Sequence, residues 1–205
     1  MSSFCYQESL ATKLYFDRTF NIDATRILPG EYYATASNML LITTLGSCVS
    51  ACIRDTQTGI GGMNHFMLPE NVQSPSVWGS SSGRYGAYAM EMLINQLFKM
   101  GAKRQNLEAK LFGGGAVVKH MKITNIGERN AEFGLDYLKA EGIPVVSQDL
   151  LDIYPRRVYF FPVTGRVLIK KLYNLHGDNT IISREQQYHA RLKESSDEGE
   201  VELFI

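Results

Sequence analysis

Residues 43–55 read Thr-Thr-Leu-Gly-Ser-Cys-Val-Ser-Ala-Cys-Ile-Arg-Asp, and this stretch decides how the chain folds. The residues that lead into it, 39–45, are aliphatic and β-branched, which predicts a strand. Apolar and polar residues then alternate over residues 49–54, which is the period of a second strand. Gly46-Ser47 separates the two. The stretch therefore predicts a strand, a tight turn and a second strand with a cysteine at its start.

The turn after the second strand predicts which residues face each other across a hairpin. If residues 55–58 form a four-residue loop, Arg54 faces Gly59 and Cys48 falls opposite His65. Directly opposed residues of an antiparallel pair share a face, with β-carbons about 4.5–5.5 Å apart. The sequence thus predicts that a thiol and an imidazole meet on one side of the sheet.

A cysteine beside a histidine has a specific chemistry. The imidazole takes the thiol proton to give a thiolate–imidazolium pair, and the thiolate attacks the carbon of a carboxamide. Backbone N–H groups at the Gly46-Ser47-Cys48 turn are candidates for stabilising the oxyanion that forms. A third group usually orients the imidazole, and Thr43 or Thr44 on the preceding strand can supply it. This chemistry needs no cofactor and no metal.

Other interpretations of the same residues exist. A cysteine is often a small buried hydrophobe, and His65 in an apolar strand can be a packed core residue. A zinc site made by Cys48, Cys52 and His65 is disfavoured, because two strand residues four apart are separated by roughly 13 Å. Gly113-Gly114-Gly115 lacks the Lys-Ser/Thr of a phosphate loop. This glycine run predicts either a flexible turn or a close backbone approach to substrate beside Phe112.

The remaining chain fits a single core of mixed α/β type. Its 205 residues carry 21 basic and 21 acidic side chains, which disfavours nucleic-acid binding. The N-terminus lacks signal-peptide features and no apolar run is long enough for membrane insertion, so we expect a cytoplasmic protein. Helices are expected at residues 85–100 and 128–140, a short capping-box helix at 183–193, and further strands at 30–35, 60–68, 107–112, 145–147, 158–161 and 167–171.

Several motifs together resemble the chemoreceptor glutamine deamidase family, CheD. They are ILPGEYYAT at 27–35, TTLGSCVSACIRD at 43–55, GGMNHFMLP at 61–69, KLFGGGA at 110–116, IGERN at 126–130 and TGRV at 164–167. The resemblance covers residues 27–172. It implies a deamidase domain over that range, an N-terminal extension at 1–26, and a C-terminal extension at 173–205 with a short helix and an acidic tail.

The family resemblance also carries expectations about activity and partners. It implies a layered α/β sandwich, with central β-sheets flanked by helices, similar to bacterial toxin deamidases. It matches the family nucleophile to Cys48, the histidine to His65 and an upstream threonine to Thr43. The implied substrates are glutamines on the cytoplasmic helices of chemotaxis receptors, and a CheC-type response-regulator phosphatase is a further possible partner. Receptor methylesterase activity occurs in some members.

One segment departs from the family pattern. Where the family carries Asp, a Gly-Gly pair and Gly-Arg, residues 149–157 read Asp-Leu-Leu-Asp-Ile-Tyr-Pro-Arg-Arg. Loss of glycine removes the freedom to adopt positive φ, so we expect an altered substrate groove or partner surface.

Three other function classes compete with a deamidase. A cysteine peptidase would cleave the chain, a transglutaminase-like transferase would need an amine acceptor, and a non-enzymatic binding module would work without Cys48.

Overall fold

The structure is a computed structural model, and it describes residues 9–68, 81–117, 126–173 and 178–196. The strands are β1 (Ser9–Leu10), β2 (Leu14–Asp17), β3 (Ile22–Arg26), β4 (Glu31–Thr35), β5 (Leu40–Leu45), β6 (Val49–Asp55), β7 (Gly61–Asn64), β8 (Leu107–Gly113), β9 (Val145–Leu150), β10 (Arg156–Phe161) and β11 (Arg166–Lys171). The helices are α1 (Ser81–Lys99), the 3-10 turn η2 (Arg104–Asn106), α2 (Ile126–Ala140) and α3 (Asp178–Ser196).

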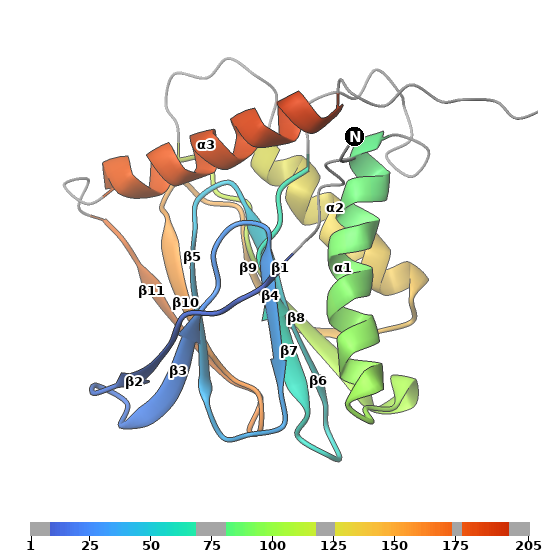
Figure 1. The fold of residues 1–205 in the computed structure, drawn as a ribbon. Helices are drawn as coiled ribbons and strands as arrows, with labels where there is room; N and C mark the ends of the chain where they lie inside the picture. The colour runs from blue at the N-terminus through green and yellow to red at the C-terminus, as the bar shows by residue number, and fades with distance from the viewer. Residues whose placement is uncertain (1–8, 69–80, 118–125, 174–177, 197–205) are drawn as a thin grey trace, which may run out of the picture.

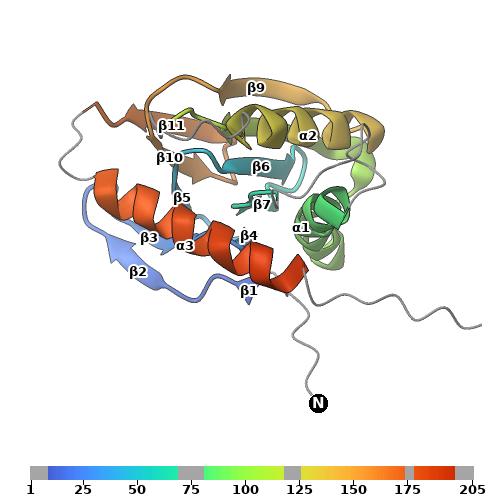
Figure 2. The same ribbon diagram turned by 90° about the horizontal axis from the view of Figure 1, so that it is seen from above.

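The strands form two mixed sheets that face each other (Figures 1 and 2). The six-stranded sheet has the order β1-β4-β7-β6-β8-β9, and the five-stranded sheet has the order β11-β10-β5-β3-β2. Helices α1 and α2 cover the outer face of the six-stranded sheet, while α3 lies across one end of the sandwich. The expected layered α/β fold is confirmed, and within the described ranges helices pack on the outer face of the six-stranded sheet.

Strand alternation on β6 explains how the layers are filled. Val49, Ala51 and Ile53 face α1 and α2 and are fully buried there. Cys48 and Cys52 point the other way, into the apolar layer between the two sheets. Alternate residues of a strand point to opposite faces, so a single strand supplies both cores. The face that holds Cys48 is therefore the inside of the sandwich.

The β6–β7 hairpin differs from the predicted register by two residues. Arg54 pairs with Gly61 rather than with Gly59. The turn is longer because the Asp55 carboxylate accepts the backbone N–H groups of Gln57 and Thr58, which winds the chain around it. A shift of two residues keeps every side chain on its face. His65 consequently shares the face of Cys48, but sits one diagonal step from it instead of directly opposite.

The ends of the chain contribute more structure than the sequence predicts. Residues 9–26 supply β1 to one sheet and β2 and β3 to the other. Helix α3 begins at Asp178, so the predicted capping box at Ser183 is wrong. The expected acidic tail lies outside the described residues, and no helix among the described residues is long and apolar enough to span a membrane.

Candidate active site

Residues 46–48 carry the chain from β5 in one sheet to β6 in the other, and we call them the nucleophile segment because Cys48 is the candidate nucleophile. Its three carbonyl groups are held by the glycine run and by α2. The bonds are Gly115 N to Gly46 O (2.7 Å), Gly114 N to Cys48 O (2.8 Å) and Asn130 Nδ2 to Ser47 O (2.9 Å). With its carbonyls held in this way, the segment leaves its N–H groups available on another side.

Those N–H groups converge on the carboxylate of Glu185, which comes from α3. Oε1 accepts from Gly46 N (2.7 Å) and Cys48 N (3.2 Å), and Oε2 accepts from Ser47 N and from the Ser47 hydroxyl (both 2.8 Å). Successive N–H groups aimed at one point form an anion-binding concavity. We call these three N–H groups the oxyanion cradle, because such donors stabilise the oxyanion of acyl transfer.

His65 follows β7, and a residue of the opposite sheet orients its ring. Oγ1 of Thr43 on β5 lies 2.8 Å from Nδ1 of His65 and donates its own proton to the carbonyl of Ile27, also at 2.8 Å. A carbonyl can only accept, so the hydroxyl must accept from Nδ1–H. This arrangement fixes the tautomer in which Nε2 carries the lone pair. Nε2 is therefore the atom available to act as a base.

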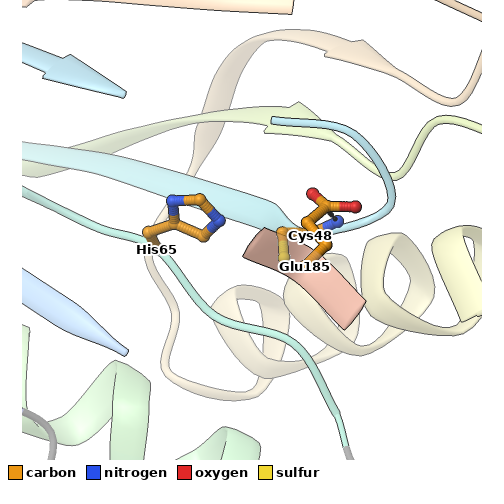
Figure 3. Close-up of side chains that lie close together, drawn as sticks. All are labelled: Cys48, His65 and Glu185. Atoms are coloured by element: carbon orange, nitrogen blue, oxygen red, sulfur yellow. Dashed lines mark hydrogen bonds between the residues drawn. The ribbon is translucent and has the colours of Figure 1, made fainter. Parts of the chain in front are cut away.

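The thiol, the imidazole and the carboxylate lie close together (Figure 3). One ligand atom each of Cys48, His65 and Glu185 lies within 4.8 Å of the other two. Nε2 of His65 points toward Cys48 and has no hydrogen-bond partner among the described residues. Cys48 is 0% exposed and His65 is 1% exposed, so the pair is closed to solvent.

The electrostatics favour neutral forms of both reactive groups in this closed state. Burial raises the pKa of the Cys48 thiol well above its ordinary value, and the Glu185 carboxylate raises it further. Burial lowers the pKa of His65 to about 4, although Glu185 opposes that shift. The ion pair expected from the sequence is therefore not the favoured state here, because desolvation dominates both groups.

The same three residues do not form a good metal site. Each carboxylate oxygen of Glu185 already accepts two hydrogen bonds, which occupies the lone pairs that a metal would need. Cys52, the other cysteine of the rejected zinc site, is a buried thiol in the layer between the sheets.

The predicted substrate-side residues are placed differently from the site itself. Phe112 is 2% exposed and packs between the sheets. Gly113 and Gly114 make their close approach to the nucleophile segment, since a Cβ on Gly113 would lie 2.2 Å from the carbonyl oxygen of Cys48. The glycine run therefore shapes the cradle from behind. Thr44 is half-buried and accepts from Arg157 Nε at 3.3 Å, so the threonine that meets His65 is Thr43.

Two residues of the site escaped the sequence reasoning. Asn130 is fully buried on α2 and also accepts the Leu68 N–H at 2.8 Å, so it ties the nucleophile segment to the chain that follows His65. Glu185 lies 137 positions after Cys48 in the sequence and reaches the site from α3. A sequence signal for Glu185 exists only in hindsight, as the start of a helical stripe with Tyr188 and Leu192.

The comparison with protein families identifies the chain. The family model described as CheD chemotactic sensory transduction matches residues 67–171. A protein of Methylobacillus flagellatus is 62% identical over 97% of this chain and 98% of its own length. The chain belongs to the CheD family. A Herminiimonas arsenicoxydans protein is 57% identical over 100% of both chains. Both relatives carry the name "Probable chemoreceptor glutamine deamidase CheD".

Among solved structures, a hypothetical protein YfiH of Bacillus licheniformis matches with a TM-score of 0.37 at 11% identity, over 73% of this chain and 64% of that one.

Residues 149–157 of this CheD chain include two residues in a backbone conformation that glycine favours. Leu151 has φ 65° and Asp152 has φ 77°, the left-handed region that glycine favours. Leu151 N donates to Gly113 O at 2.8 Å, and the buried Arg156 guanidinium binds the Leu151 carbonyl. These two residues thus place strained backbone directly behind the glycine run that supports the cradle.

Proposed function

We propose that this chain converts glutamine side chains of chemoreceptors to glutamates, with Cys48 as nucleophile and His65 as its base. The observation that carries the proposal is a single convergence. The Cys48 thiol, the Nε2 lone pair of His65 and three backbone N–H groups meet at a point already occupied by a glutamate side chain. Glutamate is the product of glutamine deamidation, so a site that holds a glutamate carboxylate in this way also has the shape to hold the glutamine substrate.

The first half-reaction breaks the amide. Nε2 of His65 takes the Cys48 proton, and Sγ forms a bond to the amide carbon while the carbonyl oxygen becomes an oxyanion in the cradle. The imidazolium then gives its proton to the amide nitrogen, and ammonia leaves. Thr43 keeps Nδ1 protonated throughout, so Nε2 both accepts the thiol proton and returns it to the amide nitrogen.

The second half-reaction releases the acid. Water attacks the thioester carbon while Nε2 removes its proton, the C–S bond breaks, and the sulfur is reprotonated. The sum is amide plus water to carboxylate plus ammonium. The site must open for this sequence, since both reactive side chains are closed to solvent in the structure.

The proposal places the reaction on the cytoplasmic helices of receptors, in a compartment where thiols stay reduced. Binding of a CheC-type phosphatase stays a prediction from the family resemblance.

Intact mass spectrometry of a receptor cytoplasmic fragment tests the proposal. Wild-type protein should add about one mass unit per modified glutamine, and Cys48→Ala and His65→Ala should abolish the gain. Cys52→Ala is the matched control, because this second buried thiol lies on the same strand face and has no role in the mechanism. A shortened fragment would indicate a peptidase. An unchanged mass with a fragment that binds would favour a non-enzymatic module.

A further inference from the structure

Helix α3 presents one narrow face to the rest of the protein. Among its described side chains, the buried ones are Glu185, Tyr188 and Leu192, at helical spacing, while Ser183, Arg184, Gln186, Gln187, Ala190 and Arg191 are exposed. Residues three and seven positions apart lie along one side of a helix. The helix therefore lies on the site along one stripe, with a glutamate at its head.

We infer that α3 is a built-in product analogue: it occupies the groove in which a substrate helix docks, with Glu185 standing where a freshly formed receptor glutamate would stand. This inference rests on the proposed function and adds how substrate is presented. The substrate glutamine arrives on an α-helix, and that helix must displace α3 before its side chain can enter the cradle.

The contacts of Glu185 match those of a product. Its carboxylate accepts hydrogen bonds from all three N–H groups of the cradle and from the Ser47 hydroxyl. One of its oxygens lies within 4.8 Å of both the Cys48 sulfur and a ring nitrogen of His65. A carboxylate satisfies every one of these donors, whereas an amide presents only one accepting oxygen. The docked state is thus selective for a glutamate carboxylate over a glutamine amide.

Among the described side chains of α3, two further residues of the stripe seat the helix. The Tyr188 hydroxyl meets that of Tyr85 on α1, and the Tyr188 ring lies against Gly30, where an added Cβ would come within 2.9 Å of it. Leu192 enters the layer between the sheets. Because most of its described residues face solvent, α3 can leave at a modest cost in buried apolar area.

The docked helix also holds the nucleophile in its resting form. Burial is the largest cause of the raised pKa of Cys48 and of the lowered pKa of His65, and the Glu185 charge raises the thiol pKa further. Departure of α3 admits water and removes that charge. Both changes favour the thiolate, so displacement and activation are one event.

The decisive experiment turns the analogue into a substrate. In full-length Glu185→Gln, residue 185 should itself be deamidated, which peptide mass spectrometry detects as a gain of about one mass unit at that position. The reaction should be first order and independent of protein concentration, since it occurs within one molecule. Gln186 and Gln187 are matched internal controls, because they lie on the exposed side of the same helix. The double variant Cys48→Ala/Glu185→Gln should stay an amide.

A second variant measures competition with substrate. Glu185→Ala should raise kcat/KM for a receptor fragment by about tenfold or more, because the side chain accepts four hydrogen bonds and one charged hydrogen bond already corresponds to about that change. It should also speed alkylation of Cys48 by iodoacetamide, with Gln187→Ala as the control on α3.

The outcomes separate the two proposals. If wild type deamidates the receptor while residue 185 stays an amide and Glu185→Ala gains no activity, Glu185 is a structural clamp, and the inference is overturned while the function stands. If neither the receptor nor residue 185 is modified, the proposed function falls and the inference falls with it.

Discussion

Replacement of Thr43 by valine should lower kcat sharply while leaving KM near its wild-type value. The Thr43 hydroxyl donates to Ile27 O and accepts from His65 Nδ1, at 2.8 Å each, in a region where both side chains are 1% exposed. Valine keeps the shape but leaves a buried N–H without its acceptor. It also removes the constraint that keeps the lone pair on Nε2.

The magnitude follows from the cost of a buried unsatisfied group. That cost is about 1–3 kcal/mol, which corresponds to a roughly 5- to 150-fold lower kcat if it falls on the reactive tautomer. The free energy of unfolding should decrease by about the same amount. Because the hydroxyl meets His65 and not the substrate, the effect belongs in kcat.

Ammonia release from a receptor fragment, followed across pH, provides the assay. Thr43→Ser keeps the hydroxyl and should retain most activity. Thr44→Val is the matched control, since this neighbouring hydroxyl contacts Arg157 and lies away from His65. Wild-type kcat in Thr43→Val, or a larger loss in Thr44→Val, would refute the assignment of Thr43 as the residue that orients His65.

Three further predictions concern stability. Leu151→Gly should raise the free energy of unfolding by about 1 kcal/mol, because glycine relieves a left-handed φ of 65°; thermal unfolding checks this, and an unchanged Tm would argue against strain. Gly113→Ala should unfold at lower denaturant and lose activity, since its Cβ would collide with the Cys48 carbonyl. For His65 the folded pKa of about 4 lies below the ordinary 6.5, so the unfolded chain binds more protons in between. Wild-type stability should therefore fall as pH drops through that window, and His65→Gln should flatten the slope in denaturant titrations.

The layers of the fold could be predicted from the local sequence pattern, because alternate residues of β6 are apolar on one face and face the second core on the other. Val49, Ala51 and Ile53 alternate with Cys52 in the sequence as they do between the two cores. The pairing register could not be predicted to the residue. The register depends on the hydrogen bonds that the Asp55 carboxylate accepts in the turn, and the hydrophobic periodicity of the strands does not predict those bonds. A register error of two residues does not change which face a side chain is on, so Cys48 and His65 still lie on the same face of the sheet.

The residues of the candidate site likewise fall into those that the sequence predicts and those that it does not. Residues within the hairpin and its preceding strand were within reach of sequence reasoning, because their neighbours in space are close along the chain. Glu185 was not, since it joins the site through tertiary packing of a helix whose average composition is polar. The glycine run predicts either a flexible turn or a close backbone approach to substrate. In the structure Gly113 makes a close backbone approach to the nucleophile segment.

Glu185 also explains how a cradle made for a transient charge can exist at rest. Three N–H groups without an acceptor, two of them buried and the third partly buried, would destabilise the fold, because unpaired buried donors cost free energy. An internal carboxylate removes that cost, and an entering glutamine oxygen then replaces one acceptor with another. The apparent affinity for substrate is therefore the intrinsic affinity multiplied by the fraction of molecules in which α3 is undocked. A helix that binds the groove well enough to displace α3 is selected over a free glutamine that cannot, so the same contact that closes the site favours substrates presented on helices.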